Sequence, residues 1–494
     1  MRQVGFDNDR YLQMQSEHIA KRIEQNGNKL YLEFGGKLFD DYHASRVLPG
    51  FAPDSKMRML KKLRDIAEIV IVICAADIEK NKVRGDLGIT YDADVLRLID
   101  VFRGFDLYVG SVVISQYSGQ PAVDAFRKRL INLGIPVYLH YPIPGYPNNI
   151  PLIVSDEGYG KNEYIETTRP LVVVTAPGPG SGKMATCLSQ LYHEHKRGVR
   201  AGYAKYETFP IWNLPLKHPV NIAYEAATVD LNDANTIDPF HLEAYGETTV
   251  NYNRDVEIFP VLKAMMERIS GESPYQSPTD MGVNMAGNAI VDDEAVREAA
   301  KMEIVRRYFQ TAVETRRSGT GQEHVEKLEL LMNQAGVNAS FSPARSAALL
   351  KEETTGGPVG AMVLPDGSVV TGKTSSLLGA ASSLMMNALK GVSGVDDEID
   401  VISDEVIEPI CRLKTDCLHS RNPRLHSDET LIALSISSAT DPLAAKLIEH
   451  IDDLRGCDAY FSVIISSTDE KLYRTLGINV CCEPKYEQHR YYHK

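Results

Sequence analysis

A short segment between a hydrophobic stretch and a helical stretch has the residue types and spacing of a phosphate-binding loop. Residues 171–183 are LVVVTAPGPGSGK. Glycines in such a loop let backbone N–H groups point at an anion, the N-terminus of the following helix adds positive potential, and a lysine supplies a full charge. We predict that a phosphate or a nucleotide binds to Gly178, Gly180, Ser181, Gly182 and Lys183.

The loop departs from the full motif, G-x-x-x-x-G-K-[ST], at two positions. Pro177 stands where the motif has its first glycine, and Met184 stands where it has a hydroxyl residue. That hydroxyl normally holds Mg²⁺, and Met184 has no hydroxyl. ATP with Mg²⁺ is therefore a candidate cofactor but not a required one. A purely structural glycine turn is the alternative.

The chain after the loop supplies a second lysine. A helical stretch ends near Gly198, and the strand-like segment RAGYAKYE follows with Lys205 near its end. From Leu171 to Glu207 the sequence resembles the dethiobiotin synthetase and cobyric acid synthase branch of P-loop proteins. This resemblance implies ATP-dependent activation of a carboxylate or similar oxyanion, with Lys183 as a phosphate contact and Lys205 as a catalytic substrate contact.

An acidic segment downstream offers a carboxylate for the same chemistry. Residues 227–247 are ATVDLNDANTIDPFHLEAYGE. We expect AATVD to be a strand, and Asp230 at its end to bind Mg²⁺ or act as a base. A solvated acidic loop is the alternative, and the role of residues 228–246 stays open.

Composition limits the functional class. The chain has 494 residues and a net charge of −13, which argues against a nucleic-acid partner. It has no apolar run long enough for a bilayer and no apolar signal core at its N-terminus, so we expect a cytoplasmic protein without a membrane partner. We expect a small phosphate- or carboxylate-bearing ligand, and a homo-oligomer is compatible with these properties.

Zinc is not expected. The seven cysteines contain no C-x-x-C pair, and no four Cys or His residues have zinc-site spacing. The segment HEH at 193–195 is not the H-E-x-x-H motif of a metalloprotease, because Arg197 occupies the position of the second histidine.

The order of apolar patterns predicts three domains. In residues 1–250, strand and helix signals alternate, which predicts an α/β domain with a doubly wound, mainly parallel sheet carrying the degenerate P-loop. Residues 251–336 are mainly helical in pattern and form a helical subdomain. Residues 337–494 form a second α/β domain, in which LIALSISSA is expected to be a strand.

The C-terminal domain has its own candidate site. Its hairpin followed by a helix, GAMVLPDGSVVTGKTSSLLGAASSLMMNALK, resembles the start of the cytidine deaminase fold but lacks the zinc ligand and catalytic acid. Further on lies a cluster that could bind a phosphate or a carboxylate, or form an exposed loop. Its members are His419, Arg421, Arg424 and His426.

The whole chain resembles an uncharacterised bacterial protein family, number 0371, a domain of unknown function. The resemblance runs through LYLEFGGKLFDDYHASRVLPGF, TAPGPGSGK and VDLNDANTIDPFHLEAYG. It brings no established activity. The sequence favours an enzyme that acts on a phosphorylated or carboxylated small molecule and could use ATP; the alternative is a non-catalytic sensor of a nucleotide or phosphometabolite.

Overall fold

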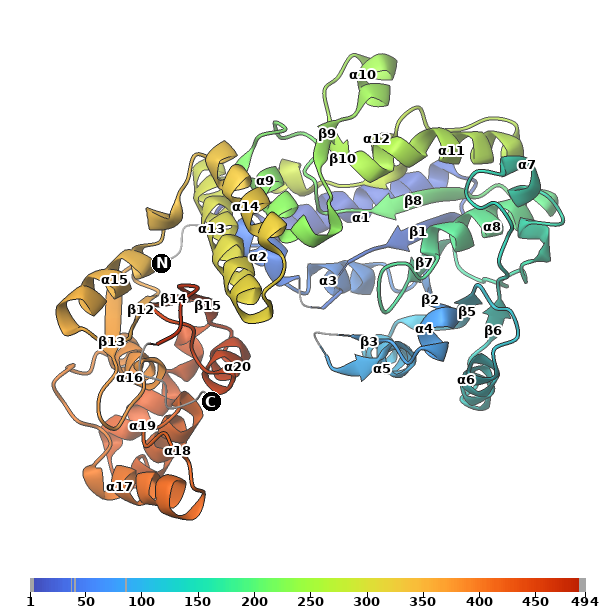
Figure 1. Ribbon diagram of the computed structural model, residues 1–494. Coiled ribbons are helices and arrows are strands. Elements are labelled where there is room, and N and C mark those ends of the chain that lie inside the picture. The colour runs from blue at the N-terminus through green and yellow to red at the C-terminus, as the bar shows by residue number, and fades with distance from the viewer. Residues whose placement is uncertain (1–3, 37, 40, 85–86, 488–494) are drawn as a thin grey trace. The chain divides into compact units, whose positions relative to one another are not determined.

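The computed structural model describes residues 4–36, 38–39, 41–84 and 87–487 (Figure 1). The chain divides into two compact units. The N-terminal unit contains Val4–Glu225 and Leu231–Arg297; the C-terminal unit contains Ala226–Asp230 and the described chain from Glu298 onward. The division into three domains at 250 and 336 stays a prediction.

A seven-stranded sheet, in which every pair of neighbours is parallel, forms the centre of the N-terminal unit. The order across the sheet is β11-β8-β1-β7-β2-β5-β6. The strands are β1 (Leu30–Phe34), β2 (Ala67–Cys74), β5 (Tyr108–Ser115), β6 (Val137–Leu139), β7 (Leu171–Thr175), β8 (Gly202–Tyr206) and β11 (Gly282–Val283). The expected large parallel sheet is therefore confirmed.

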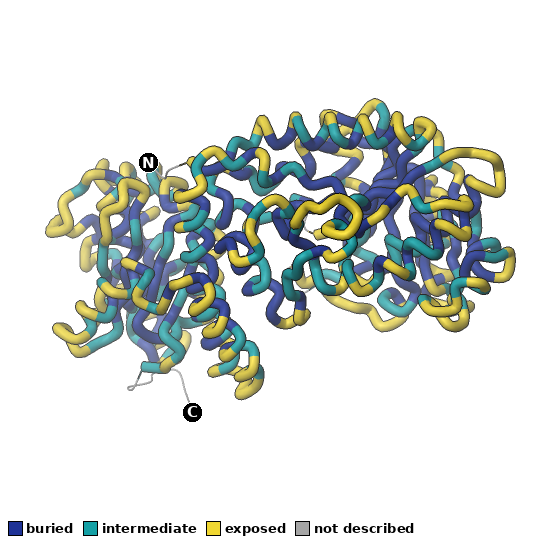
Figure 2. The backbone as a smooth tube through the Cα atoms, turned by 90° about the horizontal axis from the view of Figure 1, so that it is seen from above, coloured by how far each residue is buried: buried dark blue, intermediate teal, exposed yellow. Residues whose placement is uncertain are grey.

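The central strands are buried because both faces of the sheet are covered. All eight residues of β2, AEIVIVIC, are buried, and so are all five of β1 and of β7. A continuous run of apolar residues is typical of such strands. Figure 2 shows the buried strands of this unit as a dark blue centre. On one face, alternate residues such as Tyr31 and Val172 pack against α8 (Lys183–Lys196) and α11 (Asn253–Ser270).

The chain leaves the middle of this sheet in two directions. From β1 it passes through α2 (Tyr42–Val47) and α3 (Ser55–Lys62) to β2 and onward to β5 and β6, whereas from β7 it passes through α8 to β8 on the other side. Parallel crossovers are right-handed, so these two connections lie on opposite faces of the sheet. Ligands in open α/β sheets bind at the carboxyl ends of strands where this reversal occurs. The adjacent strands β1 and β7 meet that condition.

The other elements of the N-terminal unit are mainly helical. They are α1 (Asn8–Gln25), α4 (Ala75–Glu79), α5 (Tyr91–Gly104), α6 (Pro121–Asn132), α7 (Ile150–Ile153), α9 (Pro219–Ala227), α10 (Pro239–Tyr245) and α12 (Pro278–Met281), with the two-stranded pairs β3 (Val83–Arg84) and β4 (Ile89–Thr90), and β9 (Asn235–Ile237) and β10 (Val250–Tyr252). Helix α9 ends at Ala227, and its last two residues belong to the C-terminal unit, which includes Ala226–Asp230.

The C-terminal unit is built on a separate mixed sheet in the order β13-β12-β14-β15. Strand β12 pairs antiparallel with β13 and β14, and β14 pairs parallel with β15. The strands are β12 (Val359–Val363), β13 (Val369–Lys373), β14 (Asp458–Phe461) and β15 (Asn479–Cys482). The helices are α13 (Asp293–Ser318, which begins in the other unit), α14 (Gln322–Gln334), α15 (Pro343–Thr355), α16 (Ala380–Ser393), α17 (Asp404–Arg412), α18 (Ser427–Ser437), α19 (Pro442–Glu449) and α20 (Ser467–Thr475).

One secondary-structure prediction in this unit was wrong. The segment LIALSISSA was expected to be a strand, but its first seven residues are the end of helix α18. The helix begins at Ser427, and Asp428 and Glu429 lie in its first turn, where acidic side chains favour a helix N-terminus. Within the described ranges, no helix is long and apolar enough to cross a membrane.

Candidate functional site

The glycine-rich loop lies between the end of β7 and the start of α8. Lys183 is the first helical residue, and Gly182 is the N-cap with a φ of 91°. Because glycine has no side chain, no side chain of the N-cap residue caps the first turn of α8. The first N–H groups of a helix have no partner within the helix, so they are available to an anion.

The loop is held against the rest of the unit at two points. The Ser115 hydroxyl at the end of β5 donates to the Ser181 carbonyl oxygen at 2.6 Å. At Gly178, a Cβ atom would lie 2.4 Å from the Tyr91 hydroxyl oxygen, and Tyr91 is buried. Glycine is therefore required at Gly178 by close approach.

Two hydroxyl groups beside the start of α8 have no protein partner. Among the described residues, Ser181 Oγ and Thr186 Oγ1 are buried and without a hydrogen bond. Ser181 is 2% exposed and Thr186 is 1% exposed. Buried polar groups are normally paired, and an unpaired one calls for an explanation such as an unseen ligand or water.

A carboxylate on β1 connects the loop lysine to the strand lysine. Lys183 Nζ lies 4.0 Å from Glu33 Oε1, and the Tyr203 hydroxyl donates to Glu33 Oε2 at 2.8 Å. In the sheet register, Glu33 is opposite Lys205 of the neighbouring strand β8. Lys183 and Lys205 therefore belong to one charged cluster at the carboxyl edge of the sheet.

Lys205 lies between two carboxylates. Its Nζ is 2.8 Å from Glu207 Oε1 and forms a second ion pair with Asp255 at the start of α11. It also lies 5.7 Å from the ring centroid of Tyr252. Burial alone would lower the pKa of Lys205, but Glu207 and Asp255 raise it above the usual lysine value. Lys205 is a permanent cation near neutral pH.

Glu207 is the group in this cluster that titrates near neutral pH. Burial, together with the neighbouring Asp255, raises the pKa of Glu207 to about 7 against the opposing effect of Lys205. Two carboxylates that share one lysine do not both ionise easily. A carboxyl group with such a pKa can give or take a proton during a reaction at physiological pH.

The structure places the predicted site residues differently from one another. The loop residues 178–183 follow the carboxyl end of β7, and Lys205 lies near the carboxyl end of β8 in the same parallel sheet. The premise for Asp230 was wrong, because AATVD is not a strand: it spans the end of α9 and the first residues of a 3₁₀ turn, Val229–Leu231. Asp230 is exposed in this turn. Pro219 at the start of α9 and the alanines within it are the helix signals that were overlooked.

The acidic segment around Asp230 is mainly structural. Asp238 is fully buried, caps α10 by accepting from two backbone N–H groups, and accepts from the Thr279 hydroxyl at 2.7 Å. Asp233 is buried in an ion pair with Arg254. His241 Nδ1 lies 2.9 Å from the Ser277 hydroxyl oxygen. The contacts of Asp238 and His241 connect α10 to the segment at the start of α12, and the ion pair of Asp233 connects the chain before β9 to α11.

Three residues of the cluster were missed in the sequence. Glu33 stood within an apolar strand, and a charged residue in a buried parallel strand is itself a signal of function. Glu207 follows Lys205 at a spacing of two, which places both side chains on one side of an extended chain. Asp255 comes from a helix distant in sequence, so only the folded chain could reveal it.

The fit of a divalent cation to this edge is incomplete. Met184 has no hydroxyl and packs against the apolar core beneath α8. Among the described residues, no group of three or more His, Cys, Asp or Glu side chains is placed to hold a metal ion. We therefore derive no step that depends on Mg²⁺, and the expectation that zinc is not used stays a prediction.

The fold and the cluster define a mixed α/β protein whose glycine-rich loop and two lysines meet at the edge of a parallel sheet. The chain belongs to the family described as domain of unknown function DUF1846: the N-terminal family model matches residues 4–336, and the C-terminal one matches residues 340–492. A UPF0371 protein of Streptococcus thermophilus is 56% identical over 494 residues, which are 100% of both chains. A UPF0371 protein of Corynebacterium diphtheriae is 58% identical over 492 residues, 99% of each chain. The resemblance to uncharacterised family 0371 is confirmed.

Proposed function

We propose that the edge formed by β1, β7 and β8 binds a phosphorylated or carboxylated small molecule, and that the protein is an enzyme acting on it. The observation that carries this proposal is the position of Lys183. It begins a helix whose N-cap has no side chain, and it lies 4.0 Å from the carboxylate of Glu33. The buried hydroxyl of Ser181, which has no hydrogen-bond partner, belongs to the same loop.

Because carboxylates outnumber lysines in the cluster, it favours an anionic ligand that binds together with a proton or a cation. Three carboxylates, those of Glu33, Glu207 and Asp255, stand against the two lysines. A dianionic phosphate would increase this negative balance. Protonation of Glu207, whose pKa is raised to about 7 by burial, removes one of the charges.

The chemistry assigned to the residues follows from their groups. The amides of the first turn of α8 and the ammonium of Lys183 bind the phosphate or carboxylate. Lys205 is a cation that can orient an oxyanion of the substrate, and Glu207 holds or takes the proton. ATP is a candidate ligand on the strength of the resemblance to P-loop proteins, and the order of the C-terminal sheet is compatible with a deaminase-like domain without zinc. Cytoplasmic localisation and self-association belong to the same proposal.

A binding protein without turnover is the second candidate. It is favoured by Met184, because the side chain at the position that holds Mg²⁺ in the full motif packs into the core. Such a protein would use the same loop and differ only in having no reaction to catalyse.

The binding step, common to both candidates, is tested by thermal unfolding with ATP, ADP, GTP and inorganic phosphate. A ligand at 100 times its dissociation constant adds about 2.7 kcal/mol to the free energy of unfolding. We expect at least one of these ligands to raise the melting temperature of the natural protein. Lys183→Ala is expected to reduce the shift, and the control Lys196→Ala, at the other end of α8, to keep it. If no ligand shifts the natural protein, or if Lys183→Ala leaves the shift unchanged, the loop is only structural.

A further inference from the structure

The C-terminal unit contains a cavity of about 430 Å³ with chemically distinct walls. Ala380, Ala381, Val463 and Ile464 supply an apolar wall. Two guanidinium groups, an imidazole and two carboxylates also line the cavity, from Arg317, Arg424, His426, Asp469 and Glu487. Both its volume and this mixture of apolar surface with a few polar groups are typical of sites for small organic molecules.

His426 is held in the cavity wall by Asp469. His426 Nδ1 lies 3.1 Å from Asp469 Oδ2. The other oxygen, Oδ1, accepts from the backbone N–H of Ser427 at 2.8 Å and from its hydroxyl at 2.7 Å. The hydrogen bond to Asp469 raises the pKa of His426 above its usual value, although burial opposes it. An imidazole with this partner carries positive charge in a larger share of molecules at neutral pH.

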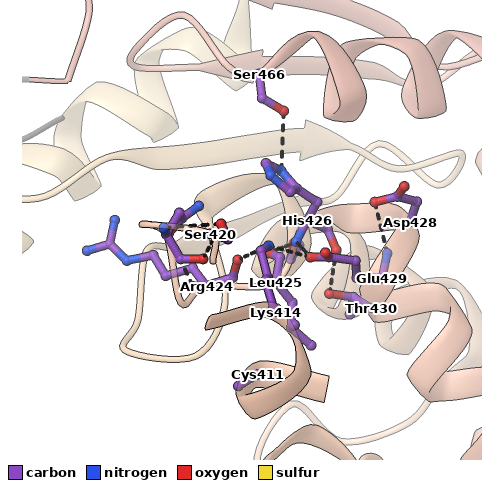
Figure 3. Close-up of polar contacts among 12 residues, drawn as sticks. Cys411, Lys414, Ser420, Arg424, Leu425, His426, Asp428, Glu429, Thr430 and Ser466 are labelled. Atoms are coloured by element: carbon purple, nitrogen blue, oxygen red, sulfur yellow. Dashed lines mark hydrogen bonds and ion pairs between the residues drawn. The ribbon is translucent and has the colours of Figure 1, made fainter. Parts of the chain in front are cut away.

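A second layer of contacts fixes the backbone on either side of this histidine (Figure 3). Lys414 Nζ donates to the Arg424 carbonyl oxygen at 2.7 Å and to Glu429 Oε2 at 2.6 Å. Glu429 Oε2 also accepts from the backbone N–H of His426 at 2.7 Å. Residues 424–426 are therefore clamped at the cavity wall, which positions the guanidinium and the imidazole together.

The ends of three helices reach the same cavity. Helix α16 begins at Ala380, α18 follows its N-cap His426, and α20 follows its N-cap Ser466; all three of these residues line the cavity. Helix N-termini carry a partial positive charge. The two arginines each have a carboxylate nearby, Arg424 at 3.3 Å from Glu487 and Arg317 at 2.9 Å from Glu470. A guanidinium has five N–H donors and can contact more than one acceptor.

We propose that this cavity is a second binding site, for a small organic phosphate whose phosphate group contacts Arg424 and His426 and whose carbon skeleton lies on the apolar wall. A guanidinium binds phosphate or carboxylate oxygens with two parallel hydrogen bonds, and a phosphate monoester has a third terminal oxygen that can also contact His426. The site is independent of the loop at Gly178–Lys183 and stands whether or not that loop binds a ligand. It also divides the sequence cluster: His419 and Arg421 are exposed, whereas Arg424 and His426 line the cavity.

The test is a calorimetric titration of the full chain carrying Lys183→Ala, so that the N-terminal loop does not contribute. The probes are phenyl phosphate, inorganic phosphate and benzoate. We expect phenyl phosphate to bind more tightly than inorganic phosphate, which lacks the apolar body, and than benzoate, which lacks the phosphate. His426→Asn and Arg424→Gln should each weaken phenyl phosphate binding by at least about tenfold, the effect of losing one hydrogen bond to a charged group.

Two matched variants control for general effects. His450 forms a histidine–aspartate pair with Asp453 at 2.6 Å but does not line the cavity, and Arg412 forms a surface ion pair with Glu408. His450→Asn and Arg412→Gln should leave the affinity unchanged. Far-UV circular dichroism and the melting temperature show whether each variant is folded. If Arg424→Gln fails to fold, it is replaced by the milder Arg424→Lys, which keeps the charge but loses the paired donors.

The pH dependence supplies a second readout. Lys414, Glu429 and Asp469 act on the charge of His426, and Arg317, Arg424 and Glu487 line the same cavity. The charge of a phosphate monoester is nearly constant between about pH 7 and pH 9, because its second pKa is about 6. Binding of phenyl phosphate should weaken over this range as His426 loses its proton, and His426→Asn should flatten the curve. Absence of phenyl phosphate binding to the Lys183→Ala chain, or equal binding by His426→Asn and His450→Asn, would overturn the proposal.

Discussion

Lys205 and Glu207 lie two residues apart at the carboxyl end of β8, and the lysine Nζ is 2.8 Å from the glutamate Oε1. Asp255 reaches the same lysine from the start of α11, so one cation serves two carboxylates. This shared arrangement explains why burial can raise the pKa of Glu207 to about 7 although a lysine stands beside it. A neighbouring carboxylate, Glu33, extends the cluster to Lys183 at the start of α8.

The protonation of Glu207 is expected to control anion binding at the loop. Glu207 loses its proton as pH rises through about 7, which adds negative charge to the cluster that contains Lys183. Sulfate serves as the probe because its charge does not change in this range. We expect its affinity to fall by about tenfold between about pH 6 and pH 8, an effect of one titrating group. Glu207→Gln should flatten the curve, whereas Glu243→Gln, a change at an exposed acid, should not; identical curves for the natural protein and Glu207→Gln would contradict this role.

The stability of the N-terminal unit should depend on the charge of Lys205. Lys205→Met leaves Glu207 and Asp255 without their cation, and removal of one partner of a buried ion pair costs about 3–5 kcal/mol. Because a quarter of the lysine side chain is exposed, we expect a loss nearer the lower end, measured by urea unfolding of the N-terminal transition. Adding Glu207→Gln to Lys205→Met should restore part of the loss. If the losses of free energy in Lys205→Met and in Glu207→Gln simply add in the double variant, the two residues are not coupled.

The loop conformation should require glycine at 178. In Gly178→Ala the new methyl group meets the buried Tyr91 hydroxyl, and overpacking of this kind costs about 1–3 kcal/mol. Gly104→Ala is the control: the new methyl would have nothing within 4 Å, and alanine is the better helix former at the end of α5. Thermal unfolding should therefore show a loss for Gly178→Ala alone. The loss caused by Gly178→Ala should be smaller in a chain that also carries Tyr91→Ala, because that change makes room for the methyl group. An equal loss in both chains would mean that the contact with Tyr91 is not its cause.

Turnover, if the protein is an enzyme, should depend on Glu207 more than on Asp230. We expect Glu207→Gln to reduce turnover by about 10²–10⁴-fold, the usual contribution of a general acid or base, with ligand affinity at fixed pH within about tenfold. Asp230→Asn should have a much smaller effect because Asp230 is exposed in a 3₁₀ turn that directly follows helix α9 rather than a strand. The assay is steady-state phosphate release from ATP, with and without a pool of carboxylic acids. Turnover that falls for Asp230→Asn and not for Glu207→Gln would restore the sequence-based assignment.

The parts of the fold that could be predicted are those whose local pattern and burial agree. The run LVVVT followed by glycines and a helical pattern predicted β7, the loop and α8. Buried parallel strands need continuous apolar residues, so the sequence and the tertiary structure impose the same pattern. The edge that carries the loop and Lys205 could be predicted for the same reason.

The errors and omissions come from interactions between distant segments or from ambiguous short runs. AATVD and LIALSISSA contain residues that suit either a helix or a strand, and the signals at their helix starts, Pro219 and the acids after Ser427, decided the outcome. Asp255 joins the cluster only because α11 packs on the face of the sheet that carries Tyr31 and α8. No local pattern in the sequence contains that information.

A crystal structure of the full chain grown with tungstate, a phosphate analogue that gives a strong anomalous signal, would show directly whether the loop binds an anion. We expect an anomalous peak at the N-terminus of α8, with oxygen atoms about 2.7–3.2 Å from the backbone nitrogens of the first turn and from Lys183 Nζ. Crystals of Lys183→Ala grown under the same conditions should lack this peak. An empty loop in the natural protein, with tungstate bound elsewhere or not at all, would contradict the claim that Gly178–Lys183 is an anion-binding site.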